Sequence, residues 1–234
     1  MKLRLHYKAD FMEIKSKQGN FRLREWMLTD GVSLAKHINN VKIWNNVRDG
    51  LPYPYTILDA DKYIRMVQVL PYVQNFAIEI AGETVGGVGI APLTDVERLS
   101  AEVGYWLGED YWNRGIMSEA VALLVDYVFR ETQIIRLFAS VYDYNNASMK
   151  VLEKVGFTRQ AILRDAAIKN GRVIDMYYYD LVKRGIIAGH LPSGLSHSDD
   201  HAQPQLAFGI FRKSVQMRTS PSHGNDKFIK KTKE

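Results

Sequence analysis

The sequence predicts a domain of the α/β class, more closely of the α+β kind, with a mixed, mostly antiparallel central sheet flanked by helices. The main observation is a series of short apolar or alternating runs, typical of strands, between longer runs with helical spacing. A second observation is that this pattern stops near residue 188, where Pro, Ser, His and charged residues take over. We therefore expect an N-terminal extension over residues 1–18, the domain over 19–188 and a basic, disordered tail over 189–234.

The expected elements follow from these runs in chain order. Strands are expected over residues 21–26, 75–81, 84–93, 101–107, 134–142, 158–169 and 172–182. Helices are expected just after residue 30 and over residues 59–70, 115–130 and 146–155. The strand over 134–142 has a long apolar run, which is typical of a central, buried position.

Turn and cap residues mark several boundaries. Thr29 and Asp30 offer an N-cap for the first helix, and the spacing of Thr56 and Asp59 predicts a cap before the second. Asn170-Gly171 is the strongest short hairpin signal in the chain and predicts that the last two strands pair. Three glycines at positions 86, 87 and 89 lie within one expected strand, where they indicate a bulge or a close backbone approach.

Composition excludes several classes of protein. The chain has no cysteine, so it holds no disulfide framework, thiolate zinc site or cysteine nucleophile. The N-terminus lacks the apolar stretch of a signal peptide, and no apolar run reaches the roughly 18 residues of a membrane span. We therefore expect a cytoplasmic protein with no membrane partner. Only His6 and His37 precede residue 188, and the later histidines are loosely spaced, so no metal is expected.

The basic excess is concentrated in the tail. Residues 189–234 carry seven basic and four acidic side chains, which leaves the expected domain nearly neutral. A basic tail could bind nucleic acid or the ribosome. Its composition favours the simpler interpretation that it is exposed to solvent and binds neither.

The most informative segment is a strand, a short loop and a helix start, over residues 101–120. The first turn of a helix exposes N–H groups and the positive end of its dipole, which stabilise a phosphate. Gly115 lets the backbone approach such a ligand, and Arg114 adds a cation beside it. These residues predict an anion site, although many helices begin near a glycine without binding anything.

Three motifs follow one another along the chain. They are Glu102-x-Gly104-Tyr105-Trp106-Leu107 with Tyr111-Trp112-x-x-Gly115-x-x-x-Glu119-Ala120, then Asn145-x-x-Ser148 with Val151-Leu-Glu-Lys154-Val-Gly156-Phe157, and finally Asn170-Gly171-x-x-x-Asp175. In this order they resemble the GNAT acetyltransferase superfamily. The resemblance covers about residues 19–184 and is strongest to the subgroup that acetylates N-terminal amines of ribosomal proteins. It implies the GNAT fold, in which two central strands splay apart, and acetyl-CoA as co-substrate.

The resemblance also implies where the co-substrate lies. Its pyrophosphate would rest on backbone amides at the loop–helix junction, and its pantetheine arm between the strands over 101–107 and 134–142. The implied cofactor contacts are Trp106, Leu107, Arg114, Gly115, Ile116, Met117, Ser118 and Asn145. Met117 is bulkier than the small residue usual at its position, so we expect a narrower or reshaped phosphate turn.

Two residues are candidates for catalysis. Glu102 lies on the strand beside the expected thioester, where a carboxylate could take a proton from an attacking amine. The structural alternative, that Glu102 pairs with a neighbouring arginine, carries equal weight. The resemblance makes Ser148 a proton donor to the departing thiolate, although Asn145 or Ser148 could serve only as an N-cap. The subgroup often has Glu where this chain has Gln160, which cannot act as a base.

The sequence therefore predicts an N-acetyltransferase that moves an acetyl group from acetyl-CoA directly to a primary amine. An N-terminal α-amine has an unperturbed pKa of about 8, against about 10.4 for lysine, so it needs a weaker base. This argument and the subgroup favour a peptide N-terminus as acceptor. The alternatives are a small amine, such as a polyamine or aminoglycoside, and a non-catalytic acyl-CoA-binding module. The assembly is expected to be a monomer or a homodimer.

Overall fold

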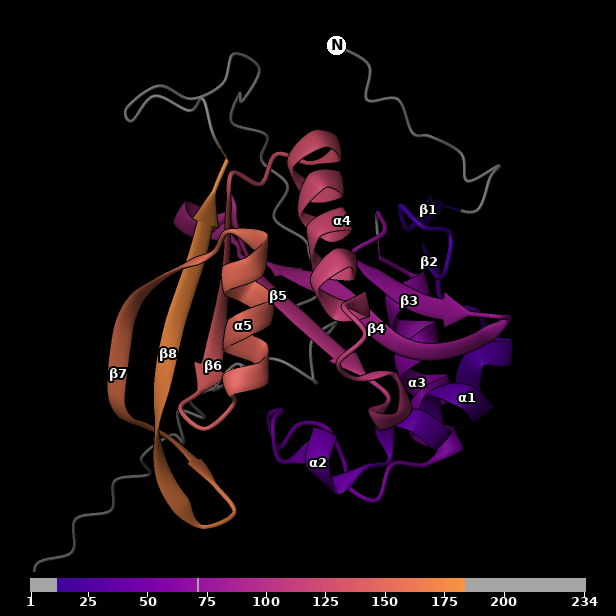
Figure 1. Ribbon diagram of the computed structural model, residues 1–234, viewed down its shortest axis with the longest axis horizontal. Coiled ribbons are helices and arrows are strands. Elements are labelled where there is room, and N and C mark those ends of the chain that lie inside the picture. Colours follow the sequence, from indigo (N-terminus) through magenta and orange to yellow (C-terminus); the bar gives the residue numbers. More distant parts are fainter. Residues whose placement is uncertain (1–11, 71, 184–234) are drawn as a thin grey trace, which may run out of the picture.

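The computed structural model describes residues 12–70 and 72–183, and these contain one sheet of eight strands. The strand order is β1-β2-β3-β4-β5-β6-β8-β7 (Figure 1). The strands are β1 (Glu13–Lys15), β2 (Arg22–Arg24), β3 (Asn75–Ile80), β4 (Glu83–Pro92), β5 (Ser100–Leu107), β6 (Arg136–Tyr142), β7 (Thr158–Lys169) and β8 (Arg172–Val182). Every neighbouring pair is antiparallel except β5 and β6, which confirms the predicted mixed, mostly antiparallel sheet.

The parallel pair in the middle of the sheet separates along its length. Ser100–Glu102 of β5 pairs with Arg136–Phe138 of β6, and the rest of these two strands, all of it described, makes no further pairs between them. Both strands pair over most of their length on their other sides, with β4 and β8. The result is a wedge that opens beyond Glu102, the splayed geometry that the resemblance implied.

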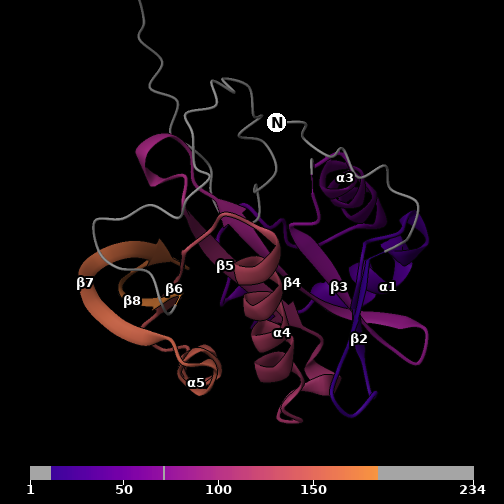
Figure 2. The same ribbon diagram turned by 90° about the horizontal axis from the view of Figure 1, so that it is seen from above.

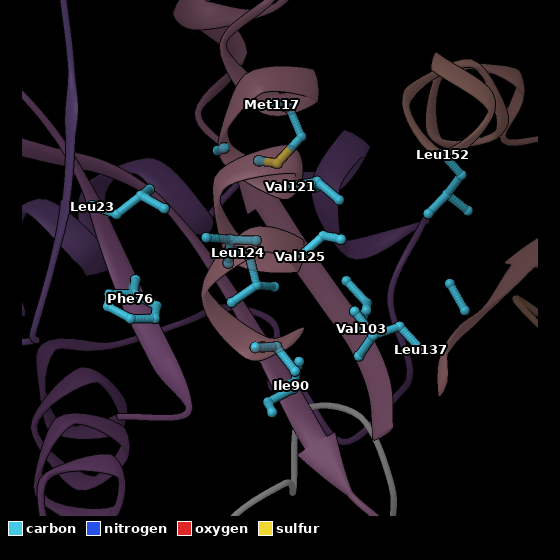
Figure 3. Packing of buried hydrophobic residues seen from close by; sticks show 14 of the residues in the cluster. Leu23, Phe76, Ile90, Val103, Met117, Val121, Leu124, Val125, Leu137 and Leu152 are labelled. Carbon is cyan, nitrogen blue, oxygen red and sulfur yellow. The ribbon is translucent and has the colours of Figure 1, made fainter. Parts of the chain in front are cut away.

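Helices cover both faces of this sheet. The longer helices are α1 (Gly31–Ile38), α3 (Ile57–Gln68), α4 (Ile116–Glu131) and α5 (Asn146–Val155), and α2 (Val41–Trp44) is a single turn. Figures 1 and 2 show α4 and α5 on one face and α1 and α3 on the other. Each face has its own buried apolar cluster; in the larger, Val121, Leu124 and Val125 of α4 pack toward the strands (Figure 3).

Local signals in the sequence position several of these elements correctly. Thr56 and Asp59 form the capping box of α3, and Gly156 ends α5 with a left-handed φ of 106°. At the tip of the β7–β8 hairpin Asn170 and Gly171 both have positive φ, 51° and 73°, as a tight hairpin turn requires. The termini of α5, β7 and β8 therefore agree with the sequence prediction.

The glycines of β4 fit the close approach that their positions predicted. A β-carbon at Gly86 would lie 2.7 Å from the main-chain oxygen of Trp106, and one at Gly87 would lie 2.8 Å from its indole nitrogen. The pairing of β3 with β4 also shifts register between Ile78 and Glu79. The register shift lies between β3 and β4, and the close approach lies between β4 and Trp106 of β5. Both affect the position of β5, which forms one wall of the wedge.

Three features differ from the sequence prediction. Asp30 does not cap α1 with its side chain, because its carboxylate is instead buried against Arg24. The segment expected as an N-terminal extension contains β1, so the sheet begins before residue 19. The short helix α2 was not predicted either. β1 has three residues and α2 has four, too few for either to show a periodic pattern in the sequence. The tail expected over 189–234 lies outside the described residues.

A buried ion network joins β2, β3 and the start of α1. Arg24 donates two hydrogen bonds of 2.7 Å to the Asp30 carboxylate and contacts Glu79, and all three side chains are at most 7% exposed. Burial opposes the charged form of Asp30, but hydrogen bonds from Arg24, Met27 and Thr84 outweigh it and lower the pKa of this carboxyl. The pKa of Glu79 is lowered in the same way, by Arg24 and Arg22 against burial.

This network should make the fold sensitive to acid. Carboxyls with a lowered pKa in the folded state stabilise it above their unfolded pKa of about 4, and the contribution is lost as pH falls through the folded values. Asp30→Asn should therefore cost about 2 kcal/mol at pH 7 and flatten the fall in stability below about pH 4. Urea unfolding across pH measures both, with the exposed Asp126→Asn as the matched control. An Asp30→Asn protein with wild-type acid sensitivity would contradict this account.

Candidate functional site

A cavity of about 490 Å³ occupies the wedge between β5 and β6. Its walls come from β5, the loop to α4, the first turn of α4, β6, α5 and residues 42–48 around α2. All ten residues that the sequence predicted for the site line this one cavity: Glu102, Trp106, Leu107, Arg114, Gly115, Ile116, Met117, Ser118, Asn145 and Ser148. Residues from positions 102 to 148 thus meet because β5 and β6 separate.

At one end of the cavity lies the start of α4. Gly115 is its N-cap, with a left-handed φ of 76°, and no described side chain caps the helix. The first N–H groups of this helix of 16 residues are therefore available to an anion. A β-carbon at Gly115 would have nothing within 4 Å, so the backbone is open on that side.

Basic side chains accompany this helix start. Arg114 lies over the ring of Tyr111, with 5.5 Å from its guanidinium carbon to the ring centre, and Lys150 and Lys154 line the cavity from α5. The sequence prediction named Arg114 but assigned nothing to the two lysines. Their signal was their spacing of four residues, which places them on one face of α5.

The residues between the two ends are apolar and mostly buried. Trp106 and Leu107 are buried on β5, and the indole of Trp112 donates a hydrogen bond of 2.7 Å to the main-chain oxygen of Leu107. Met117 belongs to the buried core cluster, and Figure 3 shows it beside Val121 on α4. Met117 therefore packs into the core as well as lining the cavity.

At the other end of the cavity Glu102 is paired with an arginine. One Nη atom of Arg48 donates to a carboxylate oxygen of Glu102 at 2.5 Å, and the two side chains are 37% and 6% exposed. This is the alternative that the sequence left open for Glu102. The pairing does not remove the carboxylate from the cavity, because both residues line it. Sequence reasoning missed Arg48, which lies in a loop without periodicity.

Ser148 is held on the opposite wall, in the first turn of α5. Its Oγ lies 2.8 Å from the phenol oxygen of Tyr105, and its N–H donates to the side chain of Asn145 at 3.1 Å. Asn145 is therefore the N-cap of α5, which leaves the Ser148 hydroxyl for the cavity. Burial raises the pKa of Tyr105 far above its ordinary value, so this phenol stays protonated and can donate to Ser148.

The rim around Glu102 is tied together by polar contacts. The amide of Asn170, at the hairpin tip, donates 2.9 Å to Asn45, and the Tyr144 hydroxyl donates 2.6 Å to the Asn45 main-chain oxygen. Lys169 contacts Asp49 at 2.6 Å and lies 3.7 Å from the ring centre of Trp44. These contacts hold the loop after α2 against the β7–β8 hairpin.

Gln160 lies away from this site. It is exposed on β7, does not line the cavity, and donates through its amide to Thr158 at 2.7 Å. Gln160, which stands where the subgroup often has a glutamate, therefore takes no part in the contacts around Glu102.

No group of three or more His, Cys, Asp or Glu side chains in residues 12–70 and 72–183 could hold a metal ion. Within the same ranges, no helix combines the length and apolarity of a transmembrane span.

Comparisons with known proteins agree with the geometry. The model of the acetyltransferase (GNAT) domain family matches residues 20–158. The chain is 39% identical over 110 residues to an uncharacterized N-acetyltransferase of Bacillus licheniformis, p20, across 47% of this chain and 61% of that one. It is 33% identical over 103 residues to YdaF, a putative ribosomal N-acetyltransferase of Bacillus subtilis, across 44% and 56%. These alignments span about three fifths of the relatives' length.

A solved structure shows the same fold. The RimL acetyltransferase of ribosomal protein L7/L12, in complex with coenzyme A, superposes with a TM-score of 0.67 at 22% identity, over 74% of this chain and 98% of that one. This confirms the expectation of a GNAT fold with splayed central strands.

Proposed function

Because the chain belongs to the GNAT acetyltransferase family, we propose that it transfers the acetyl group of acetyl-CoA to a primary amine, with a protein N-terminal α-amine as acceptor. The observation that carries this proposal is the single cavity with two unlike ends. An uncapped helix start with cations lies at one end, and the Glu102 carboxylate at the other.

The residues at the helix start suit the phosphates of CoA. Main-chain N–H groups of Ile116, Met117 and Ser118 would bind the pyrophosphate, with Arg114 as a neighbouring cation. Trp106 and Leu107 line the passage from there toward Glu102, where the pantetheine arm would lie along the unpaired part of β5. Asn145 completes the wall from the α5 side.

At the other end the proposal assigns two proton transfers. The amine nitrogen attacks the thioester carbonyl carbon while Glu102 accepts a proton from that nitrogen. The carbon–sulfur bond then breaks, and Ser148 gives a proton to the leaving thiolate and takes one back from solvent, while the Tyr105 phenol stays hydrogen-bonded to its oxygen. Main-chain N–H groups near the thioester would stabilise the oxyanion between these steps.

The choice of acceptor rests on chemistry and on similar proteins. An α-amine with a pKa near 8 is partly neutral at pH 7, so a carboxylate paired with Arg48 is a sufficient base. The similarity to YdaF, named as a putative ribosomal N-acetyltransferase, and to RimL, an α-N-protein acetyltransferase of ribosomal L7/L12, supports a protein acceptor.

A non-catalytic acyl-CoA-binding module is the rival, and one observation favours it. The ion pair with Arg48 already engages a carboxylate oxygen of Glu102, which would have to accept the proton of the amine. A panel of amines with acetyl-CoA separates the two, because a binder has affinity without turnover. Peptides beginning with Ser or Ala, polyamines and aminoglycosides in the same panel identify the acceptor class.

Acetyl-CoA should stabilise the folded protein. Ligand at about 100 times its Kd adds roughly 2.7 kcal/mol to the free energy of unfolding, because it binds only the folded state. Differential scanning fluorimetry with acetyl-CoA, CoA and, as a control, ATP measures this as a rise in Tm. No rise with acetyl-CoA or CoA at millimolar concentration would contradict the assignment of the cavity.

A further inference from the structure

We propose that Arg48 selects acceptors that carry a carboxylate close to the reacting amine and rejects amines with additional positive charge. This inference rests on the proposed function and narrows its substrate class. Its starting observation is that Arg48 and Glu102 face each other in the cavity, 2.5 Å apart, at the end away from the helix start.

The charges around the cavity favour an anionic acceptor. Over the described residues the lining holds one carboxylate, Glu102, and five basic side chains, of which Lys42 is paired with Glu109 outside the lining and the others are Arg48, Arg114, Lys150 and Lys154. The phosphates of CoA account for the cations near α4 and α5. At the acceptor end, a polyamine would bring several positive charges to a single carboxylate that already has a cationic partner, so binding it is electrostatically unfavourable.

Arg48 is held at its backbone but is partly exposed at its side chain. The loop is tied on both sides of it, through Asn45 to Tyr144 and Asn170 and through Asp49 to Lys169. The backbone of Arg48 is therefore positioned, whereas its side chain, 37% exposed, can turn from one partner to another. Glu102, only 6% exposed, has much less freedom.

An arriving amine changes the balance between these two groups. Its ammonium approaches the carboxylate that Arg48 already contacts, and two like charges at one carboxylate repel each other. A carboxylate on the acceptor offers the guanidinium a new partner, since arginine pairs with carboxylates in a two-pronged geometry. The carboxylate oxygen of Glu102 that Arg48 contacted can then accept from the amine. Acceptors without a carboxylate lack this exchange.

The carboxylate could come from an acidic side chain next to a peptide N-terminus or from the α-carboxylate of a free amino acid. The test compares kcat/KM for matched peptides that begin Ser-Asp, Ser-Asn and Ser-Lys, and for free serine against serinamide. We expect at least about tenfold preference for Ser-Asp over Ser-Asn, the usual value of a hydrogen bond to a charged group, and a lower rate still for Ser-Lys. If the ratio of kcat/KM for free serine to that for serinamide exceeds the ratio for Ser-Asp to Ser-Asn, the carboxylate comes from a free amino acid.

Variants at position 48 test whether Arg48 causes the preference. Arg48→Gln should reduce the Ser-Asp to Ser-Asn ratio to about one, Arg48→Lys should keep part of it, and Arg48→Glu should favour Ser-Lys. Arg130→Gln is the matched control, because Arg130 is an exposed residue of α4 with its own ion pair outside the cavity. All variants are checked for the Tm rise with CoA.

The outcomes separate this inference from the function on which it rests. Acetylation of all three peptides at equal rates by the wild-type protein, or a preference that persists in Arg48→Gln, overturns the role of Arg48 and leaves the function standing. Binding of acetyl-CoA without acetylation of any amine overturns both. If Arg48→Gln does not fold, the salt dependence of the wild-type protein is the test. Its preference for Ser-Asp over Ser-Asn should shrink as ionic strength rises, because Arg48 is partly exposed. An unchanged ratio would contradict an ion pair between Arg48 and the acceptor.

Discussion

Glu102→Gln is expected to lower kcat by about a hundredfold to ten-thousandfold at pH 7, with the Kd for CoA nearly unchanged, because a general base is lost. The substitution keeps the size of a side chain that is 6% exposed and can still accept from Arg48, so the cavity should persist. The loss should shrink at high pH, where the acceptor amine deprotonates without help. Steady-state kinetics from pH 6 to pH 10, with CoA affinity by calorimetry, measure both effects.

A matched control separates this loss from a general effect of removing a carboxylate. Glu131→Gln changes an exposed residue at the end of α4 that pairs with Arg130 and does not line the cavity, so its kcat should equal that of the wild type. If Glu102→Gln keeps more than about a third of the wild-type kcat, well short of a general-base loss, solvent or another group removes the proton and Glu102 is structural.

Gly115→Glu should abolish the binding of CoA while the protein remains folded. The substitution places a carboxylate at the uncapped start of α4, where the proposal puts the pyrophosphate, and two anions there repel each other. The left-handed φ of 76° costs any other residue about 1–2 kcal/mol, but a β-carbon there meets nothing within 4 Å. We expect no Tm rise with CoA and a Kd raised at least about a hundredfold.

Two variants separate charge from backbone strain. Gly115→Ala has the same unfavourable φ without the carboxylate and should keep most of the affinity for CoA. Gly82→Glu adds the same side chain at a φ of 84°, also with nothing within 4 Å of its β-carbon, in a turn outside the cavity lining. If folded Gly115→Glu protein keeps wild-type affinity, Gly115 only eases the turn before α4.

Short-range signals account for what the sequence predicted well. Asn170-Gly171 defines a hairpin through its own backbone preferences, and Thr56 with Asp59 defines a helix start three residues apart, so neither needs tertiary context. The ten candidate residues lie together because the sequence motifs specify where β5 and β6 separate. Positions within such motifs could be read from the chain alone.

Long-range pairs account for what the sequence missed. Arg48 meets Glu102 across 54 positions, and Asp30 turns from a cap position to Arg24 because that buried arginine needs a counter-ion. Lys169 is buried between Asp49 and Trp44, although lysine is usually exposed. Such contacts depend on which loops the fold brings together, and no short-range pattern in the sequence predicts them.

The central claim is that this chain moves an acetyl group onto an α-amine, and one measurement tests it most directly. The protein is incubated with acetyl-CoA and a peptide that has both a free N-terminal Ser and an internal Lys, and fragment masses locate the acetyl group. The account predicts enzyme-dependent acetylation of the N-terminal nitrogen, with release of one CoA thiol for each peptide modified. Release of no thiol despite CoA binding, or acetyl found only on the lysine side chain, would contradict it.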